Sequence, residues 1–277
     1  MSHTNIPLAG VIGCPISHSL SPRLHGHWLK RYGISGHYIP LEVQPDDLVE
    51  VLGAMSRMGF VGANVTIPHK EAALRLADQV SDRATLIGAA NTLIFRPDHT
   101  IYADNTDGYG FMQNLRQNCP DWDPKAGPAV VIGAGGASRA IIVALLDAGV
   151  PEIRLTNRTR LRADQLKSEF GGKISVYDWV HLDRMLDGAA TLVNTTSQGM
   201  VGNPPLKINL GDLPTSALVT DIVYTPLETP LLAQAREHGC RTVDGLGMLL
   251  HQAVPGFYRW FGTQPTVDEE LRQVVLG

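Results

Sequence analysis

The fold of this chain is decided by the stretch Ala129-Val130-Val131-Ile132-Gly133-Ala134-Gly135-Gly136-Ala137-Ser138. An apolar, mostly β-branched run typical of a buried strand leads into a Gly-x-Gly turn, and a helical pattern follows from Ala137 to Asp147. This order brings free N–H groups and the positive end of a helix dipole to one point, where a pyrophosphate can approach bare backbone. We expect a side chain at Gly133 or Gly135 to block that approach. The stretch predicts a dinucleotide-binding strand–turn–helix unit, in which Ser138 replaces the third glycine of the general fingerprint.

The end of the next expected strand indicates which dinucleotide binds. An NAD site needs an acidic residue about 20 residues after the glycines to bond the ribose hydroxyls. Here the sequence is Asn157-Arg158-Thr159-Arg160-Leu161-Arg162, which contains no acid. A charge-assisted hydrogen bond from arginine to phosphate is worth about 1.5–3 kcal/mol, and positive charge at a helix N-terminus otherwise opposes the dipole. The run therefore favours the 2′-phosphate of NADP over NAD.

The rest of the chain alternates between short apolar runs and helical patterns. Downstream of the glycine turn, this alternation predicts a parallel sheet with helices on both faces. Upstream, the first third has a βαβα rhythm that ends in a hairpin of two strands, 90–96 and 100–104. The Pro- and Gly-rich segment 119–128 is interpreted as a connection between two lobes. The helical pattern from Leu246 to Phe261 closes the second lobe or returns to the first, and periodicity leaves both options open. The remaining strands are expected at 8–13, 37–43, 62–66, 129–133, 152–157, 174–177, 191–194, 218–222 and 241–243.

Composition restricts the class of protein. The 277 residues are 44% apolar and 18% charged, which is typical of a globular chain long enough for two lobes. A net charge of −4 argues against nucleic acid or an anionic membrane as a partner. Cys14, Cys119 and Cys240 are far apart and odd in number, which favours reduced thiols over disulfides or a zinc site. We find no signal-type pattern at residues 1–5 and no bilayer-spanning run, so we expect a cytoplasmic protein.

Neutral hydrogen-bonding residues gather at the expected strand ends of the first lobe. Ligands of parallel α/β sheets bind beyond the carboxyl ends of strands, so these segments predict one pocket for a small polyhydroxylated molecule. Each segment also has a structural explanation, such as a helix N-cap at Ser21-Pro22. The segments are 19–22, 64–70, 91–92 and 104–108.

Lys70 and Asp107 are opposite charges in that set. Reduction of a ketone by hydride needs a proton at the developing alkoxide, and a lysine ammonium both stabilises and protonates it. A nearby carboxylate would orient the ammonium and keep it charged. An ordinary salt bridge is the competing interpretation, and the two charges alone favour it.

Nine segments together make the sequence similar to the shikimate dehydrogenase family. They keep the order of that family and cover nearly the whole chain. They are Gly13-Cys14-Pro15-Ile16-Ser17-His18-Ser19-Leu20-Ser21-Pro22, Gly62-Ala63-Asn64-Val65-Thr66-Ile67-Pro68-His69-Lys70, 88–93, 104–108, 133–138, 157–159, Asn194-Thr195-Thr196-Ser197-Gln198-Gly199-Met200, Asp221-Ile222-Val223-Tyr224 and 244–252.

The resemblance implies reversible reduction of 3-dehydroshikimate to shikimate with NADPH, a step of aromatic amino-acid biosynthesis. It also implies a two-lobe α/β fold, in which residues 1–108 form a substrate-binding catalytic domain. Residues 109–245 would form a Rossmann-type NADP domain with a doubly wound parallel sheet. Helices within 246–277 would pack back on the substrate domain. We expect a monomer or homodimer with no metal.

The resemblance also implies roles for single residues. Lys70 would be the acid–base residue, paired with Asp107; His69 beside it is a less favoured proton donor, because Lys70 alone matches the family position. Ile222 stands where many relatives carry methionine. The substrate would be bound by Ser19, Ser21, Asn64, Thr66, Lys70, Asn91, Asp107, Tyr224 and Gln252. The cofactor would be bound by Gly133, Ala134, Gly135, Gly136, Ala137, Asn157, Arg158, Thr159, Arg162, Ile222, Gly245 and Met248.

Two other functions compete with this one. The first is an NAD-dependent quinate/shikimate dehydrogenase, which the second serine of Ser19-x-Ser21 and the run Asn157-Arg158-Thr159 disfavour. The second is a regulatory protein that senses NADP without turnover, which Lys70 and Asp107 argue against. Hydrolase signatures of the H-E-x-x-H and G-x-S-x-G types are absent from the sequence.

Overall fold

The computed structural model describes residues 6–277, apart from the side chain of Asp183. Residues 1–5, where no signal-type pattern was found, lie outside the described residues. The chain forms two compact units, and the first contains the chain up to Thr106 together with Leu250–Gly277. The second unit is Asp107–Leu249. These divisions lie close to the expected boundaries at residues 108 and 245 but do not coincide with them.

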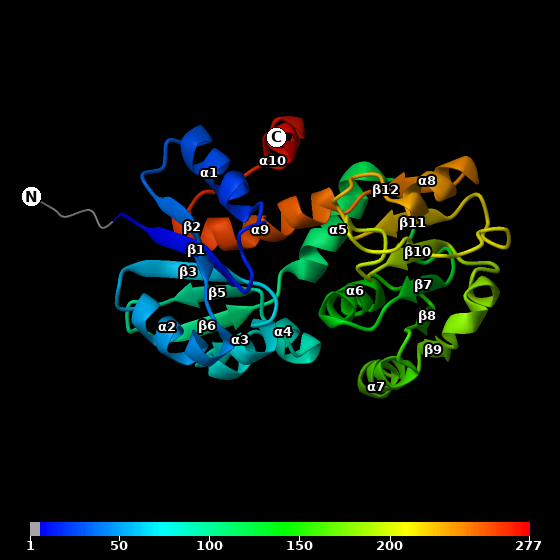
Figure 1. The fold of residues 1–277 in the computed structure, drawn as a ribbon, viewed down its shortest axis with the longest axis horizontal. Coiled ribbons are helices and arrows are strands. Elements are labelled where there is room, and N and C mark those ends of the chain that lie inside the picture. Colours follow the sequence, from blue (N-terminus) through cyan, green and yellow to red (C-terminus); the bar gives the residue numbers. More distant parts are fainter. Residues whose placement is uncertain (1–5) are drawn as a thin grey trace, which may run out of the picture. The chain divides into compact units, whose positions relative to one another are not determined.

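The first unit is built on a six-stranded mixed sheet of order β2-β1-β3-β5-β6-β4 (Figure 1). β1 is parallel to β2 and β3, as the βαβ rhythm predicts, and β5 and β6 pair as the expected antiparallel hairpin. The strands are β1 (Leu8–Gly13), β2 (His37–Glu42), β3 (Phe60–Val65), β4 (Gln79–Val80), β5 (Thr92–Phe95) and β6 (Ile101–Asp104). The helices are α1 (Ser21–Arg31), α2 (Leu48–Met55), α3 (Lys70–Leu76), α4 (Asp82–Ile87), α10 (Glu269–Leu276) and α9 (Leu246–Phe261) from Leu250 onward.

The second unit carries a six-stranded sheet of order β12-β11-β10-β7-β8-β9, all parallel. This is the strand order of a doubly wound dinucleotide-binding fold, with its reversal between β10 and β7, so the α/β fold class is confirmed. The strands are β7 (Ala129–Ile132), β8 (Ile153–Thr156), β9 (Ile174–Tyr177), β10 (Thr191–Asn194), β11 (Leu218–Asp221) and β12 (Arg241–Val243). The helices are α5 (Asp107–Asn118), α6 (Gly136–Asp147), α7 (Arg160–Phe170) and α8 (Pro230–Glu237).

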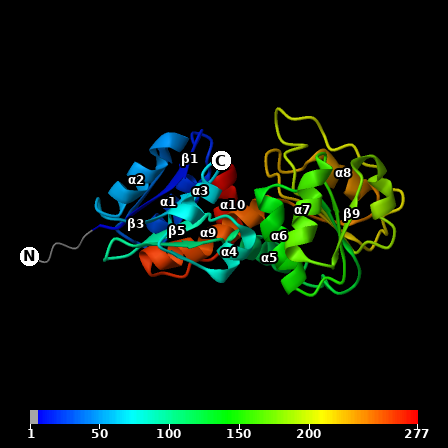
Figure 2. The ribbon, with the colours of Figure 1, turned by 90° about the horizontal axis from the view of Figure 1, so that it is seen from below.

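The packing on the two faces of β7 explains why its sequence is continuously apolar. Val131 lies in the hydrophobic cluster that also contains Ile141 of α6, whereas Val130 and Ile132 lie in a second cluster with Leu232 of α8. Successive side chains of a strand point to opposite faces, so a strand covered on both faces needs apolar residues throughout. Helices therefore cover both faces of this sheet, and α5 lies beside α6 (Figure 2).

The interpretation of segment 119–128 as a connection between lobes is wrong. The chain crosses between the units at Thr106/Asp107, so this segment lies inside the second unit. Trp122 is buried in the same hydrophobic cluster as α6, and its indole N–H donates to Thr191 Oγ1 at 2.9 Å. The turn-forming residues around Trp122 bend a segment that is packed against the sheet.

The residues after Leu250 pack on the first unit. The Trp260 indole N–H donates to the Leu93 carbonyl at 3.0 Å, which joins α9 to β5. Arg31 of α1 forms an ion pair with Asp268, the N-cap of α10, at 2.6 Å. Of the two options that periodicity left open, α9 takes the return to the first unit from Leu250 onward. Within residues 6–277, no helix is both long and apolar enough to cross a membrane.

His25 is a fully buried titratable group in this packing. Its ring stacks on Tyr38 with centroids 3.9 Å apart and lies near Trp28 and Trp260. Burial disfavours the imidazolium and lowers the pKa of His25 to about 3. The first unit therefore holds a neutral histidine at its core.

This histidine predicts a loss of stability in mild acid. The unfolded chain takes up the proton near pH 6.5 and the folded chain only near pH 3, so the contribution of His25 is complete above pH 6.5 and falls as pH falls to 3. Between pH 7 and pH 5, the expected loss in the free energy of unfolding amounts to about 2 kcal/mol. Urea unfolding followed by the fluorescence of Trp28 and Trp260 measures it. We expect His25→Phe to flatten the pH dependence and the exposed control His37→Gln to keep it; equal slopes in all three proteins would contradict the assignment.

Candidate active site

The glycine turn after β7 leaves open space at the start of α6. An added Cβ at Gly135 or Gly136 would meet no heavy atom within 4 Å, as a site for a phosphate group requires. Gly133 differs: its φ is +112°, and a Cβ there would lie 2.6 Å from Thr195 Oγ1. Glycine at 133 is therefore required by the protein itself, a reason that the sequence argument did not include, and the expected block of the pyrophosphate stays a prediction.

Asn157 and Ser138 hold this turn in place. The Asn157 side chain accepts from the Ala134 N–H at 3.1 Å and donates to the Thr159 carbonyl at 2.8 Å. Ser138, at the position of the missing third glycine, is fully buried and donates to the Gly135 carbonyl at 2.6 Å. The structure thus brings the glycine turn and the run after β8 together through one amide.

The arginines after β8 divide into two groups. Arg160 forms ion pairs with Asp164 and Asp178. Arg158 and Arg162 are exposed, and neither forms an ion pair within the described part of the chain. Two cations next to the expected ribose position are therefore free to bind an anion.

Three further residues expected at the cofactor, Ile222, Gly245 and Met248, lie together after β11 and β12, in the half of the sheet away from β8. A Cβ at Gly245 would lie 2.5 Å from the carbonyl carbon and oxygen of Ile222. Met248 is buried in a cluster against which Ile222 packs. Gly245 is needed because two backbone segments approach too closely for any side chain.

A hydrogen-bonded network of buried side chains joins the expected substrate residues of the first unit. Asn91 Nδ2 donates to Gln252 Oε1 at 3.2 Å across 161 positions of sequence, and its Oδ1 accepts from the Thr106 N–H at 2.8 Å. Asn64 Nδ2 donates to the Asn91 carbonyl at 3.1 Å. The network brings together Asn64 of β3, Asn91 just before β5 and Gln252 of α9.

Tyr38 links this network to α1, and the sequence argument missed it. Its hydroxyl donates to Asn64 Oδ1 at 2.7 Å. Burial raises the pKa of Tyr38 well above 10, and a hydrogen bond with Ser21 opposes that shift. Ser21 in turn donates its N–H to Ser19 Oγ at 3.3 Å. Tyr38 is the one buried residue of the otherwise exposed or half-exposed strand β2, and its partner Asn64 is 26 positions away in the sequence, so no local pattern marks it.

Thr66 and Lys70 follow the end of β3. Thr66 lies against the first strand, since a Cβ at Gly13 would lie 2.6 Å from its Cγ2. Lys70 is the first residue of α3, is half-buried, and accepts at its carbonyl from the Ala90 N–H at 2.9 Å. Lys70 therefore starts its helix directly beside the residue that precedes Asn91.

His69 has a structural contact that explains its burial. It is 1% exposed, and its Nε2 lies 2.8 Å from the Val43 carbonyl, to which it donates. A nitrogen bound to a carbonyl carries the proton and holds it there. This contact supports Lys70 rather than His69 as the acid.

The two remaining expected residues, Asp107 and Tyr224, belong to the second unit. Asp107 is buried, begins α5 and directly follows Thr106 of the Asn91 network in the chain. Tyr224 is half-buried, and burial raises the pKa of its hydroxyl. Both side chains have the limited solvent access that a binding residue needs.

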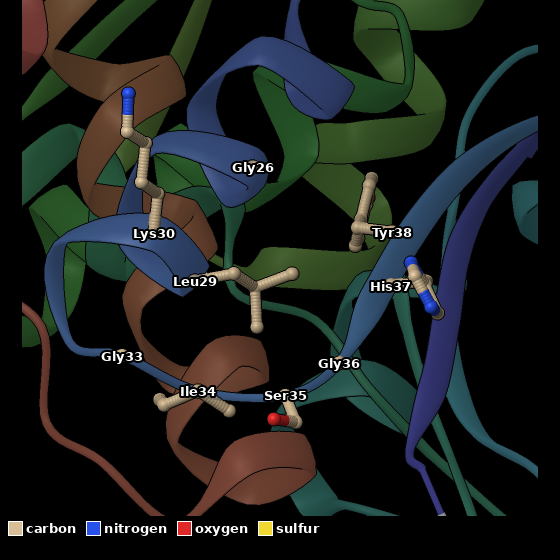
Figure 3. Close-up of a pocket in the computed structure, with 9 residues that line it drawn as sticks. All are labelled: Gly26, Leu29, Lys30, Gly33, Ile34, Ser35, Gly36, His37 and Tyr38. Carbon is tan, nitrogen blue, oxygen red and sulfur yellow. The ribbon is translucent and has the colours of Figure 1, made fainter.

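A surface pocket of about 460 Å³ in the first unit is a separate feature (Figure 3). It lies between the second half of α1 and the start of β2, and Lys30, His37 and Tyr38 are among its lining residues. None of the expected site residues lines it. In residues 6–277, no group of three or more His, Cys, Asp or Glu side chains is arranged to hold a metal ion.

Comparisons with known proteins give a consistent picture. Residues 11–93 match the family model for the shikimate dehydrogenase substrate binding domain, and residues 117–203 match the model for shikimate / quinate 5-dehydrogenase. A shikimate dehydrogenase (NADP(+)) of Paracoccus denitrificans is 66% identical over 98% of this chain and 96% of its own.

Two solved structures are similar over nearly the full length. Quinate dehydrogenase from Corynebacterium glutamicum, in complex with NAD, has a TM-score of 0.91 at 31% identity and covers 98% of this chain and 99% of its own. Shikimate 5-dehydrogenase from Thermus thermophilus, with NADP(H) and shikimate, has a TM-score of 0.86 at 35% identity and covers 98% of each chain.

Proposed function

The chain belongs to the shikimate dehydrogenase family, and we propose that Lys70 and Asp107 carry out the proton transfer of its reaction. It is an NADP-dependent enzyme that interconverts shikimate and 3-dehydroshikimate, a step that serves aromatic amino-acid biosynthesis. The observation that carries the proposal is the buried Asn64–Asn91–Gln252 network, because Lys70 starts its helix beside that network and Asp107 follows Thr106 within it.

The proposed chemistry is general acid–base catalysis. NADPH, when bound, supplies the hydride. The Lys70 ammonium stabilises the developing alkoxide on the substrate and donates its proton to that oxygen. In the reverse direction, neutral Lys70 accepts the proton of the hydroxyl. Asp107 orients the ammonium, as a carboxylate does for a neighbouring cation.

We propose that the first unit binds the substrate. Amides both donate and accept, so Asn64, Asn91 and Gln252 suit the hydroxyls of a polyhydroxylated ring, with Thr66 as a further partner. The network holds each amide in a defined orientation, which lowers the cost of ordering the site on binding. Ser19 and Ser21 would bind the substrate carboxylate. The role of Tyr224, which belongs to the second unit, stays a prediction from the sequence.

The second unit fits NADP. The space above Gly135 and Gly136 at the start of α6 suits the pyrophosphate, with Gly133, Ala134 and Ala137 forming the rest of the turn. Arg158 and Arg162 would bind the 2′-phosphate, with Asn157 and Thr159 beside the ribose. Ile222, Gly245 and Met248 would lie at the nicotinamide. The cytoplasmic location and the choice between monomer and homodimer stay predictions from the sequence.

Initial rates with four substrate–cofactor pairs test the function. We expect kcat/KM to be highest for shikimate with NADP, because the run after β8 offers arginines and no acid. A higher value for quinate with NAD would support the quinate dehydrogenase alternative, which the similar Corynebacterium glutamicum structure makes worth testing. No turnover of any pair at saturating concentrations would support the NADP-sensing alternative.

Lys70→Ala is expected to lower kcat by about 10²–10⁴, the usual contribution of general acid–base catalysis, while KM for shikimate changes little. Steady-state rates in both directions measure it. The exposed residue Lys30 provides a control of the same type in the same unit, and Lys30→Ala should leave both constants unchanged. A large rise in KM with kcat intact would reassign Lys70 to binding.

Arg158→Ala is expected to weaken NADP by about ten- to a hundred-fold and to leave NAD nearly unchanged, because only NADP carries the 2′-phosphate. Dissociation constants for both dinucleotides measure it. Arg160→Ala is the matched control, since Asp164 and Asp178 already pair with that guanidinium. Equal losses for NADP and NAD in Arg158→Ala would show that this arginine does not contact the phosphate.

A further inference from the structure

Asp221 is a buried carboxylate at the carboxyl end of β11 that the proposed mechanism does not use. It is 0% exposed, and three donors from three segments bind it. Its Oδ1 accepts from Asn194 Nδ2 and from the Val223 N–H, both at 3.0 Å. Its Oδ2 accepts from Thr229 Oγ1 at 2.8 Å. A buried carboxylate is costly unless it is hydrogen-bonded, and these three bonds supply the donors that it needs.

The bond to Asn194 sets the conformation of the loop after β10. With its Nδ2 held by Asp221, Asn194 presents Oδ1 to the N–H and the hydroxyl of Thr196, at 3.0 and 2.8 Å. The same Nδ2 also donates to the Gln198 carbonyl at 3.1 Å. A flipped amide would put oxygen against the carboxylate, so Asp221 selects one orientation.

This loop lies directly beside the glycine turn. Thr195 Oγ1 donates to the Ile132 carbonyl at 2.8 Å, and it is the atom that a Cβ at Gly133 would strike. Thr195 is held by its own bond to the Ile132 carbonyl, so this wall of the glycine turn does not depend on Asp221. The bond to the Val223 N–H fixes the next loop, which carries Ile222 and Tyr224.

We propose that Asp221 is a positioning residue for hydride transfer: its carboxylate locks the loops after β10 and β11 in one arrangement, so that Ile222 and Tyr224 meet cofactor and substrate. This proposal rests on the roles given above to those two residues. Asp221 acts through backbone and amide contacts and does not touch substrate or cofactor.

The third contact of Asp221, with Thr229, allows its positioning role to be tested separately from a contribution to stability. Thr229 is the N-cap of α8, where its hydroxyl accepts from the Leu232 N–H, so its bond to Asp221 ties the helix to the sheet. A variant at Thr229 removes this tie and leaves both bonds of Oδ1 in place. The effect of loop position is thereby separable from the effect of the helix cap.

Asp221→Ala and Asp221→Asn form the main test. In Asp221→Asn, the remaining oxygen still accepts from Asn194 and Val223, and the new amide N–H points to the Thr229 oxygen, which has a free lone pair. We expect Asp221→Ala to raise KM for shikimate and to lower kcat, each by about tenfold, as the loss of one or two hydrogen bonds implies. Asp221→Asn should restore both constants to within about threefold.

Three controls accompany these variants. The compound 2′,5′-ADP contains the adenosine half of NADP and lacks the nicotinamide half. Its affinity should change less than about twofold in Asp221→Ala, because Arg158 and the glycine turn bind the adenosine half. Thr229→Val should lower the melting temperature without changing KM. Asp212→Ala removes an exposed carboxylate of the same unit and should change nothing. If Asp221→Ala does not fold, Asn194→Ala removes one of the two loop contacts. It is expected to raise KM and lower kcat in the same way, with the affinity for 2′,5′-ADP nearly unchanged.

Hydrogen exchange at the Val223 amide keeps this proposal separate from the proposed function. That amide should be protected in the wild type and in Asp221→Asn and exposed in Asp221→Ala, whatever substrate the enzyme uses. A wild type without shikimate turnover would overturn the proposed function alone. Unchanged KM and kcat in folded Asp221→Ala, equal losses in Asp221→Asn, or a parallel loss of 2′,5′-ADP affinity would overturn the role of Asp221.

Discussion

Polar side chains at or next to the ends of the strands are buried in both units, and each of them must find a hydrogen-bond partner or destabilise the fold. In the first unit, Asn64 and Asn91 meet this requirement through Tyr38, Thr106 and Gln252. In the second, Asn194 and Asp221 meet it through each other and through the loops they hold. Because the partners come from distant parts of the chain, satisfying these groups also fixes the loops that carry the function.

The two networks differ in the polar groups they use. The amides of the first unit both donate and accept, and in Asn64 and Asn91 both roles are taken by protein partners. The carboxylate of Asp221 accepts three donors and burial raises its pKa, so its hydrogen-bonding capacity is spent on the protein. Amides that donate and accept therefore hold together the polar core of the first unit, whereas in the second unit a single carboxylate gathers its donors.

The sequence predicts those parts of the fold and site that depend on local order. The strand–turn–helix after Ala129 and the hairpin before Asp104 are confirmed, because period and turn residues determine them within a few positions. The prediction of a connection at segment 119–128 was wrong, because its prolines and glycines resemble those of a linker while Trp122 packs into the core. Tyr38 and the contact between Gly133 and Thr195 were missed because they depend on partners far away in sequence. Composition carries no signal for such partners.

Selectivity between cofactors shows why fold and residues must be argued separately. A quinate dehydrogenase that was solved with NAD has nearly the same fold as this chain, so the doubly wound sheet by itself does not choose the dinucleotide. The choice depends on how the charges after β8 are paired. Asp164 and Asp178 neutralise Arg160, whereas Arg158 and Arg162 keep their charge for an anion. Of the three arginines in this run, Arg160 is thus held by two carboxylates while Arg158 and Arg162 are exposed, a division that only the three-dimensional arrangement of the acids determines.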